Sequence, residues 1–410
     1  MRIDLTLSAA SQFIYKVLGY VILALLARYL TKAEFGEFLF AASLAGMFVL
    51  FTEFGTSNHL IRETGADPDL ASLRFSEVFA ARLPLLATYL LAVNAFALVF
   101  KPDLLVVIAI TSVYVGLKDL YRACAAVLLG VGRVGLTIAV YGSGLLLLVG
   151  LVLVVIRRDG GLIEVLVAYC VWTAYIVLAG LAVVWRVVGR PSWSRGSRES
   201  RSVLRKAFPL FLLAALTLLH FKVDTVMLGF MRSYSEVATY EAAAKLLEAS
   251  QFLVRPLWMI FLPICAALVG GRQVPRLKAL LRKLSFGSAA LGLAVAIPVI
   301  AAAAWIIPQV FGTGFENSAP ILRVLYMSVP ALFVATVATF VAVALHLERA
   351  GVRIMMFSVV LNIALNAALI PTWGALGAAW TTLVTQTLVA VWMVGLDVRA
   401  MGRLEADSAT

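Results

Sequence analysis

Nine of the 34 lysine and arginine residues of this chain lie inside stretches that otherwise have the composition of transmembrane helices. A cation at the centre of a helix in hydrocarbon costs about 2.5–3.5 kcal/mol on insertion scales, so such residues face acids, one another or a hydrated cavity. Only five acids lie in the same stretches, and the excess predicts a positive interior suited to an anionic ligand. The nine cations are Lys16, Arg28, Arg82, Lys118, Arg122, Lys222, Lys245, Arg255 and Arg323. The five acids are Glu53, Asp119, Asp224, Glu241 and Glu248.

The composition excludes a soluble domain. The chain is 62% hydrophobic and 14% charged, whereas a soluble domain carries about 25% charge. A net charge of +12 would agree with nucleic-acid binding, but the basic residues lie in short loops between apolar spans and form no basic face. The three cysteines fall within apolar spans without CxxC spacing, which predicts buried apolar side chains and no disulfide or metal site. We therefore expect an integral membrane protein with no nucleic-acid partner.

Apolar stretches of about 20 residues predict twelve transmembrane spans. The fold class expected is an all-α polytopic membrane protein built from two six-helix lobes around a central cationic cavity. The expected organisation is a lobe at 1–190, a basic linker at 191–206, a second lobe at 207–398 and a tail at 399–410. The spans are predicted at 8–30, 36–60, 78–100, 104–130, 134–156, 162–185, 207–231, 236–269, 285–312, 321–346, 351–370 and 374–397.

The loop cations set the orientation. Twenty lie on the side that holds the termini and five on the opposite side, so the positive-inside rule predicts that both termini are cytoplasmic. An internal repeat supports two lobes: the segment from Thr31 to Phe38 resembles the segment from Ser233 to Tyr240 at an offset of 202. Repeated bundles commonly bind substrate where they meet and rock around it.

Three motifs carry a family resemblance: Phe35-Gly-Glu-Phe38, Lys222-Val-Asp224-Thr-Val-Met-Leu-Gly229 and Asn362-Ile-Ala-Leu-Asn366. The chain resembles polysaccharide exporters of the multidrug/oligosaccharidyl-lipid/polysaccharide (MOP) superfamily, and among them the Wzx-type flippases. The resemblance implies alternating access in the bacterial cytoplasmic (inner) membrane. It implies that a polyprenyl-pyrophosphate-linked oligosaccharide moves from the inner to the outer leaflet, with membrane lipids around a functional monomer. Glycosyltransferases and a polymerase are the expected companions.

Two other functions stay open. A multidrug or cation antiporter uses the same fold, but relatives of that kind rely on an acid in the first helix, where this chain has Lys16. A membrane enzyme acting on the lipid-linked sugar would need a sizeable outside loop, and the outside loops here are short. We therefore expect a transporter, with no catalytic residues.

The buried cations are the candidate substrate ligands. Lysine binds a pyrophosphate as a point charge, and arginine binds it through two parallel hydrogen bonds. The hypothesis is that one set captures pyrophosphate and a second set in the other lobe assists. The alternatives are that Arg82 extends to the membrane surface and that Asp119 merely neutralises Arg122. The first set is Lys16, Arg82, Lys118 and Arg122, and the second is Lys222 and Arg255.

A third set suits ion coupling or gating. Asp224, Asn362, Asn366 and Thr382 offer the oxygen ligands that Na⁺ requires, and the alternative is a structural hydrogen-bond cluster between helices. A proton relay through His220 would make H⁺ the coupling ion. Gating candidates are Glu53, with Lys16 as its expected partner, and the pair Lys245 and Glu248. The alternative for this pair is that the two charges only neutralise each other within one helix. No cofactor other than a coupling ion is expected.

Overall fold

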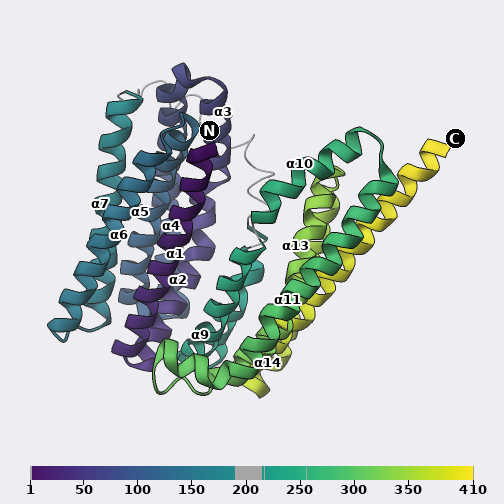
Figure 1. Ribbon diagram of the computed structural model, residues 1–410. Coiled ribbons are helices and arrows are strands. Elements are labelled where there is room, and N and C mark those ends of the chain that lie inside the picture. Colours follow the sequence, from purple (N-terminus) through teal and green to yellow (C-terminus); the bar gives the residue numbers. More distant parts are fainter. Residues whose placement is uncertain (1, 190–214, 217, 255, 410) are drawn as a thin grey trace. The chain divides into compact units, whose positions relative to one another are not determined.

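The computed structural model describes residues 2–189, 215–216, 218–254 and 256–409, and these residues form helices and no strand. The chain divides into two compact units, Met1–Leu218 and Leu219–Thr410, which we call the first lobe and the second lobe (Figure 1). The predicted linker at 191–206 and the candidate ligand Arg255 lie outside the described residues.

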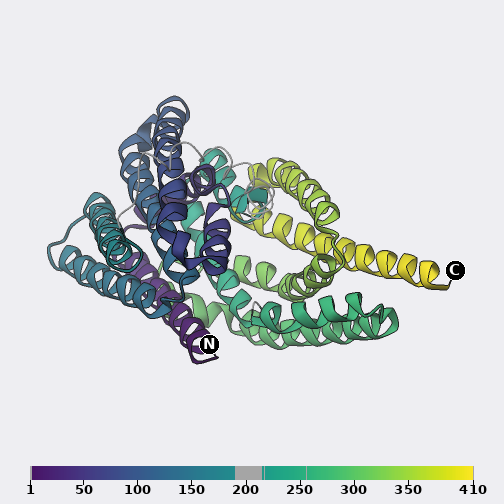
Figure 2. The same cartoon turned by 90° about the horizontal axis from the view of Figure 1, so that it is seen from above.

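The first lobe is a bundle around α5. This helix packs against α2, α3, α4 and α7, while α6 packs against α7 and α1 (Figure 2). The central position of α5 explains why its residue Asp119 is enclosed by neighbouring helices. The helices are α1 (Arg2–Tyr29), α2 (Lys32–Glu53), α3 (Thr56–Ala66), α4 (Ala71–Phe100), α5 (Leu105–Gly130), α6 (Val134–Arg157) and α7 (Leu162–Val187), with 3₁₀ turns at Pro68–Leu70 and Pro102–Leu104.

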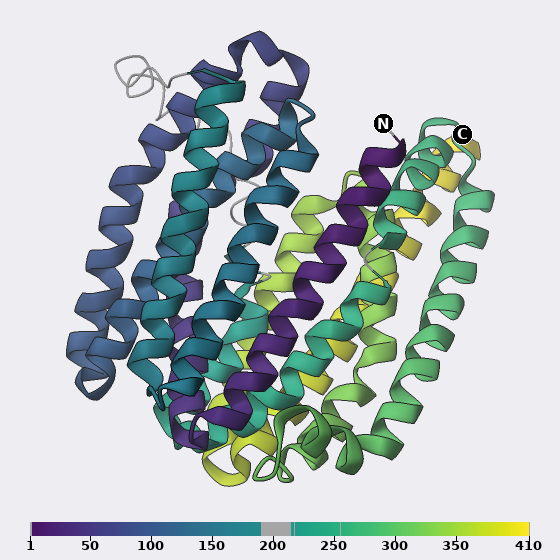
Figure 3. The same cartoon turned by 60° about the vertical axis from the view of Figure 1, so that its left-hand side comes forward.

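The second lobe is arranged around α13, which packs against α10, α11 and α14 (Figure 3). Its first helix covers residues 219–231 of this lobe. The others are α9 (Tyr234–Ser250), α10 (Pro256–Gly270), α11 (Val274–Phe311), α12 (Ser318–Met327), α13 (Val329–Ala344) and α14 (Glu348–Ala409), with a 3₁₀ turn at Gln251–Leu253. The tail predicted at 399–410 is thus helical as far as Ala409.

The surface of the helices is apolar, as a lipid environment requires. Leu91 is 73% exposed, Phe286 72% and Trp305 68%. Among the described residues, seven helices are long and apolar enough to cross a bilayer, and the bent pair α12 and α13 forms an eighth such span. α14 contains two of the predicted spans, because Gly374 (φ 54°, ψ −136°) separates two helices within it.

Three predicted spans were wrong as continuous helices. The span at 36–60 breaks where Phe54 (φ 46°) and Gly55 (φ 72°) adopt the left-handed conformation, ending α2 and starting α3. The span at 236–269 breaks before Pro256, whose ring leaves no N–H for a helical bond. The span at 321–346 bends by 40° between α12 and α13, where Pro330 stands in the first turn of α13.

Candidate functional site

Arg82 of α4 is the central cation of the first lobe. Its side chain is 0% exposed, and Nε and Nη2 donate to Thr56 Oγ1 at 2.9 and 2.7 Å. Nη2 also donates to Ser57 Oγ at 2.8 Å, and Nη1 to the Asp119 carbonyl oxygen at 2.8 Å. The break at Gly55 places the two hydroxyls at the start of α3, where they meet the guanidinium. Arg82 does not extend to the membrane surface, because protein groups enclose its charge.

Asp119 of α5 lies between two arginines. Its Oδ2 is 3.6 Å from Arg82 Nη1 and accepts a hydrogen bond from Thr52 Oγ1 at 2.6 Å. Its Oδ1 is 3.8 Å from Arg122 Nη1, as the spacing of three residues predicted. One carboxylate that is 2% exposed therefore stabilises both guanidinium groups.

Arg122 also pairs with Glu53, the last residue of α2. The Arg122 Nη1 to Glu53 Oε2 distance is 2.9 Å, and the two side chains are 50% and 21% exposed. The expected partner of Glu53 was Lys16, whereas the structure gives Arg122. Lys16 lies on the exposed side of α1.

Lys118 of α5 has a different environment. Its Nζ lies 5.5 Å from the centroid of the Trp172 indole, and it makes no ion pair within the described part of the chain. Trp172 packs against Tyr141 and Tyr169 with centroids 5.9 and 5.8 Å apart, and Tyr141 packs against Tyr15 at 5.2 Å. A half-buried ammonium group therefore sits on an aromatic surface with no carboxylate of its own.

The second lobe holds a quartet of two lysines and two glutamates. Lys222 Nζ is 2.8 Å from Glu248 and 3.7 Å from Glu241. Lys245 Nζ is 3.0 Å from Glu248 and 3.3 Å from Glu241. Thr225 donates a further hydrogen bond to Glu241. The charges balance, which agrees with the expectation that Lys245 is neutralised within its own helix.

Asp224 organises a separate polar cluster that joins the first helix of the lobe, α9 and α14. Asn366 Nδ2 donates to Asp224 Oδ1 at 2.6 Å, while Tyr240 Oη and Thr382 Oγ1 donate to Oδ2 at 2.7 Å each. Asn366 Nδ2 also donates to Asn362 Oδ1 at 2.9 Å. All four residues of the predicted ion set therefore come together. Asp224 is 2% exposed and has no cationic partner among the described residues.

His220 extends this cluster by one helical turn. Its Nε2 lies 2.9 Å from Gln386 Nε2, and its Nδ1 lies 3.5 Å from Ser358 Oγ. The histidine is 3% exposed and occupies an interhelical position. It continues the face of Asp224, as the spacing of four residues predicted.

Sequence reasoning missed several members of these clusters. Tyr240 was noted as part of the internal repeat, but no function was predicted for it. Thr56, Ser57 and Gln386 were not among the candidate site residues. A signal existed for Gln386, because it follows Thr382 by four residues on one face of an apolar helix. For the two hydroxyls of α3 there was none, since their partner is 25 or more residues away along the chain.

Arg232 and Glu236 hold the break in α14 from both sides, and we call them the Arg232–Glu236 clamp. Arg232 donates to the carbonyl oxygens of Ile370 (3.0 Å) and Pro371 (2.9 Å), and Glu236 accepts from Ala375 N at 3.2 Å. The cation thus caps the carbonyl end of one helix and the anion the amide end of the next. Arg323 of α12 makes a long contact of 3.4 Å from Nε to the Ile300 carbonyl oxygen.

Comparison with known proteins gives one family match. The model for a family described as "Polysaccharide biosynthesis protein" matches residues 4–269. A search of curated proteins found no match.

Solved structures share the fold at low identity. An inward-facing multidrug resistance MATE family transporter of the MOP superfamily has a TM-score of 0.77 at 15% identity, covering 95% of this chain and 96% of that chain. Lipid II flippase MurJ, in an inward closed conformation, has a TM-score of 0.70 at 11% identity, covering 98% and 91%. A MOP superfamily transporter from Pyrococcus furiosus, described as having a binding pocket of reversed polarity that suggests a different function, has a TM-score of 0.63 at 13% identity, covering 98% and 95%.

Proposed function

Because the chain belongs to the polysaccharide biosynthesis protein family and shares its fold with transporters of the MOP superfamily, we propose that it is a membrane transporter, and specifically a flippase for polyprenyl-pyrophosphate-linked oligosaccharide. It moves this lipid from the inner to the outer leaflet of the bacterial cytoplasmic membrane by alternating access, with both termini cytoplasmic. It works as a monomer, after glycosyltransferases have built the oligosaccharide and before a polymerase extends it.

Lys118 carries this proposal. It is a half-buried cation above an aromatic surface, without an ion pair in the described part of the chain. A pyrophosphate has fixed negative charge, and an ammonium group that no carboxylate neutralises is a ready partner for it. Arg122 and Lys16, both exposed, are the further ligands we assign in this lobe. Arg82 positions the helices around them, because its own donors are occupied by protein groups.

In the second lobe we assign Lys222 and Arg255 to the later stage of transport. Lys222 is 17% exposed and shares its acids with Lys245. A phosphate that displaced Glu248 from Lys222 would leave that glutamate paired with Lys245. The quartet can in this way change partners without leaving a buried charge alone, which is the property expected of a gate.

The coupling ion we propose binds at Asp224. The carboxylate has no cationic partner in the described part of the chain, and the buried Asn366 Oδ1 has no hydrogen-bond partner. Carboxylate and carbonyl oxygens are the ligands of hard cations. Na⁺ is the first candidate, and H⁺ shared with His220 is the second. Transport that is unchanged when choline replaces sodium would rule out Na⁺.

The test of the flippase is the sidedness of the lipid-linked sugar. In a strain lacking the protein, the lipid-linked oligosaccharide should accumulate on the cytoplasmic face, and the wild-type gene should reverse this. Lys118→Met should reduce the rescue at least tenfold, with Lys118→Arg intermediate. The matched control is Lys101→Met, since Lys101 also lies over an aromatic ring, 5.8 Å from the Phe40 centroid. Unchanged sidedness in the deletion strain, or full rescue by Lys118→Met, would contradict the proposal.

A multidrug or cation antiporter remains the second candidate, supported by the fold shared with the MATE transporter and by the buried carboxylate of Asp224. An antiporter would extrude cationic dyes from vesicles, and Asp224→Asn would stop it. Under the flippase proposal, cationic dye efflux is absent, and Lys118 rather than Asp224 determines whether substrate binds.

A further inference from the structure

Asp397, near the C-terminal end of α14, is an acid that the proposed transport cycle does not use. Its side chain is 0% exposed, and both carboxyl oxygens are buried without a hydrogen-bond partner in the described residues. It also makes no ion pair there. A carboxylate in such a place is costly, because an ionised group taken from water without a partner loses several kcal/mol of hydration.

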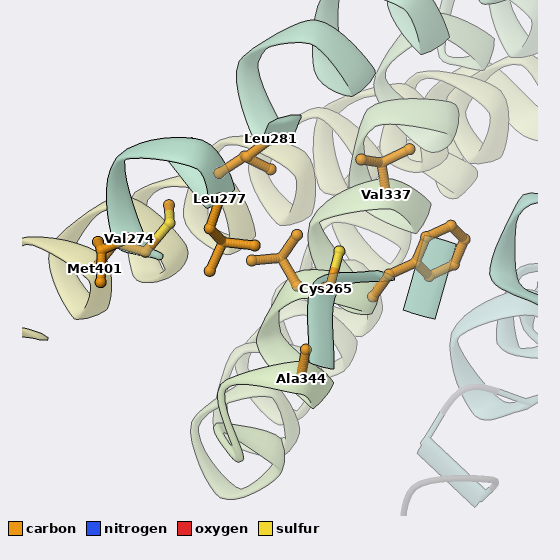
Figure 4. Close-up of a cluster of buried hydrophobic side chains, with 9 residues drawn as sticks. Cys265, Val274, Leu277, Leu281, Val337, Ala344 and Met401 are labelled. Carbon is orange, nitrogen blue, oxygen red and sulfur yellow. The ribbon is translucent and has the colours of Figure 1, made fainter. Parts of the chain in front are cut away.

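The apolar surroundings of Asp397 follow from its position on the helix. Met393 and Met401 lie one turn before and one turn after it, on the same face. Met393 belongs to a buried cluster with Ala335, Ala338 and Ala342 of α13. Met401 belongs to a second cluster with residues of α10, α11 and α13 (Figure 4). The face that carries Asp397 is therefore covered by apolar side chains on both sides of it. The residues that pack with Met401 are Cys265, Val274, Leu277, Leu281, Val337, Phe340, Val341 and Ala344.

The helices packed against this face supply no charge to Asp397. α13 has no titratable residue, and in α10 the one titratable group is Cys265, which interacts electrostatically with Asp397. On α11, Lys278 pairs with Glu405, two turns beyond Asp397. The charged groups of α9 and α12 make their contacts elsewhere: in the quartet, in the Arg232–Glu236 clamp and, for Arg323, at the Ile300 carbonyl oxygen. The other cations of α11 and α14 are Arg276, Arg282, Lys283, Arg349, Arg353, Arg399 and Arg403, none of which pairs with Asp397 in the described part of the chain.

We propose that Asp397 is a proton-binding site that locks the C-terminal part of α14 against α10, α11 and α13. With a proton bound, the side chain is a small neutral group that the methionine face accommodates. When the proton leaves, the buried charge has no partner, and α14 separates from the apolar cluster until water reaches the carboxylate. The ligand is H⁺, and the lock does not depend on which substrate the protein transports.

Cys265 is the reporter that tests this lock. It is 0% exposed, and its thiol becomes accessible to maleimide only when the cluster opens. The experiment uses the full chain in detergent with Cys124→Ala and Cys170→Ala, so that Cys265 is the single thiol. The labelling rate is divided by that of a peptide thiol at the same pH, because thiolate content rises with pH. From pH 6 to pH 9 the corrected rate should rise about tenfold or more.

Asp397→Asn should abolish this rise, because an amide does not ionise. Glu405→Gln is the matched control, since it removes the Lys278 pair at the same end of α14 and should keep the rise. Equal pH dependence in Asp397→Asn and the parent, or a flat rate in the parent, overturns the proposal. Where Asp397→Asn does not fold, amide exchange of residues 393–405 in the unsubstituted chain decides. The exchange rates are corrected for the intrinsic rate at each pH. If the corrected rates do not increase from pH 6 to pH 9, the proposal is overturned as well.

Discussion

The charged core of the first lobe has more cations than acids. Arg82 and Arg122 meet Asp119 and Glu53, and Lys118 stands beside them without a carboxylate in the described residues. The two arginines differ in exposure, at 0% and 50%. Arg82 is therefore a structural cation, whereas Arg122 and Lys118 are only partly buried.

The second lobe has the opposite surplus. Lys222 and Lys245 are balanced by Glu241 and Glu248, and Asp224 then remains as an acid with hydroxyl and amide partners only. The two lobes are both helical bundles, but the charged clusters described here have an excess of cations in the first lobe and an excess of acids in the second. This difference agrees with our proposal that the anionic substrate binds in the first lobe and the coupling ion in the second.

The largest expected effect in this comparison is the loss of Arg82. Arg82→Met leaves Asp119 buried with its nearest charge removed, and breaking a buried pair in this way costs about 3–5 kcal/mol. The measurement is the free energy of unfolding by denaturant in detergent micelles. Arg122→Met is the control, because its half-exposed pair with Glu53 should contribute about 1 kcal/mol or less.

A double substitution separates the cost of an unpaired buried charge from the loss of the other contacts of Arg82. Arg82→Met with Asp119→Leu removes both charges, and its stability should recover part of the loss seen in the single variant. No recovery would show that the hydrogen bonds to Thr56 and Ser57, rather than the ion pair, hold α3 against α4. An Arg82→Met protein as stable as wild type would contradict the structural role altogether.

The quartet of the second lobe should tolerate more. Lys245→Met leaves Lys222 within 2.8 Å of Glu248 and 3.7 Å of Glu241, so the remaining lysine still serves both acids. Because three of the four side chains are 16–31% exposed, solvent screens part of the change, and the loss should be about 1–2 kcal/mol. The same unfolding assay measures it.

Removing both lysines should cost more than the sum of the single losses, since Glu241 and Glu248 then face each other without either lysine. A double-mutant cycle over Lys222→Met and Lys245→Met gives this coupling energy directly. Additive losses would mean that each lysine acts on its own acid, and the quartet would then not be able to exchange partners as a gate.

How much the sequence could predict depended on the distance of each contact along the chain. Spacing of three or four residues correctly joined Asp119 to Arg122, Lys245 to Glu248 and Asn362 to Asn366, because helix geometry alone fixes those neighbours. It could not pair Glu53 with Arg122, since their contact depends on how α2 packs against α5.

The same limit applied to helix breaks. Phe54 has no sequence signal for a left-handed backbone, and the break it makes at Gly55 positions the hydroxyls that bind Arg82. The four residues of the predicted ion set could be picked out from the sequence, because polar residues are conspicuous in apolar spans. The direction of their hydrogen bonds to Asp224 required the structure.

The two lobes also differ at one repeated glutamate. Glu34 in the first lobe closes a capping box on Thr31, accepting from its backbone N–H at 3.0 Å and its hydroxyl at 2.7 Å. Glu236, at the equivalent position of the repeat, reaches instead to the amide of Ala375 across the break in α14. Gly374 permits this approach, because a Cβ there would clash with the Glu236 carboxylate. One glutamate stabilises its own helix, and the other joins the second helix of α14 to α9.

The smallest predicted effect concerns the Arg232–Glu236 clamp. It distinguishes two explanations of how the clamp stabilises the protein: the ion pair between the two residues, or the interaction of each charge with a helix end. Glu236→Gln or Arg232→Gln should each cost about 0.5–1 kcal/mol, the usual contribution of a charge at a helix end. The swap Arg232→Glu with Glu236→Arg keeps two opposite charges at the positions whose side chains now lie 3.9 Å apart. If the ion pair alone matters, the swap should restore stability. If the charges complement the helix ends, it should be worse than either single variant, because it places an anion at the carbonyl oxygens of Ile370 and Pro371. We expect the second outcome, with amide exchange of residues 370–376 accelerated in the swap and unchanged in the Glu34→Gln control.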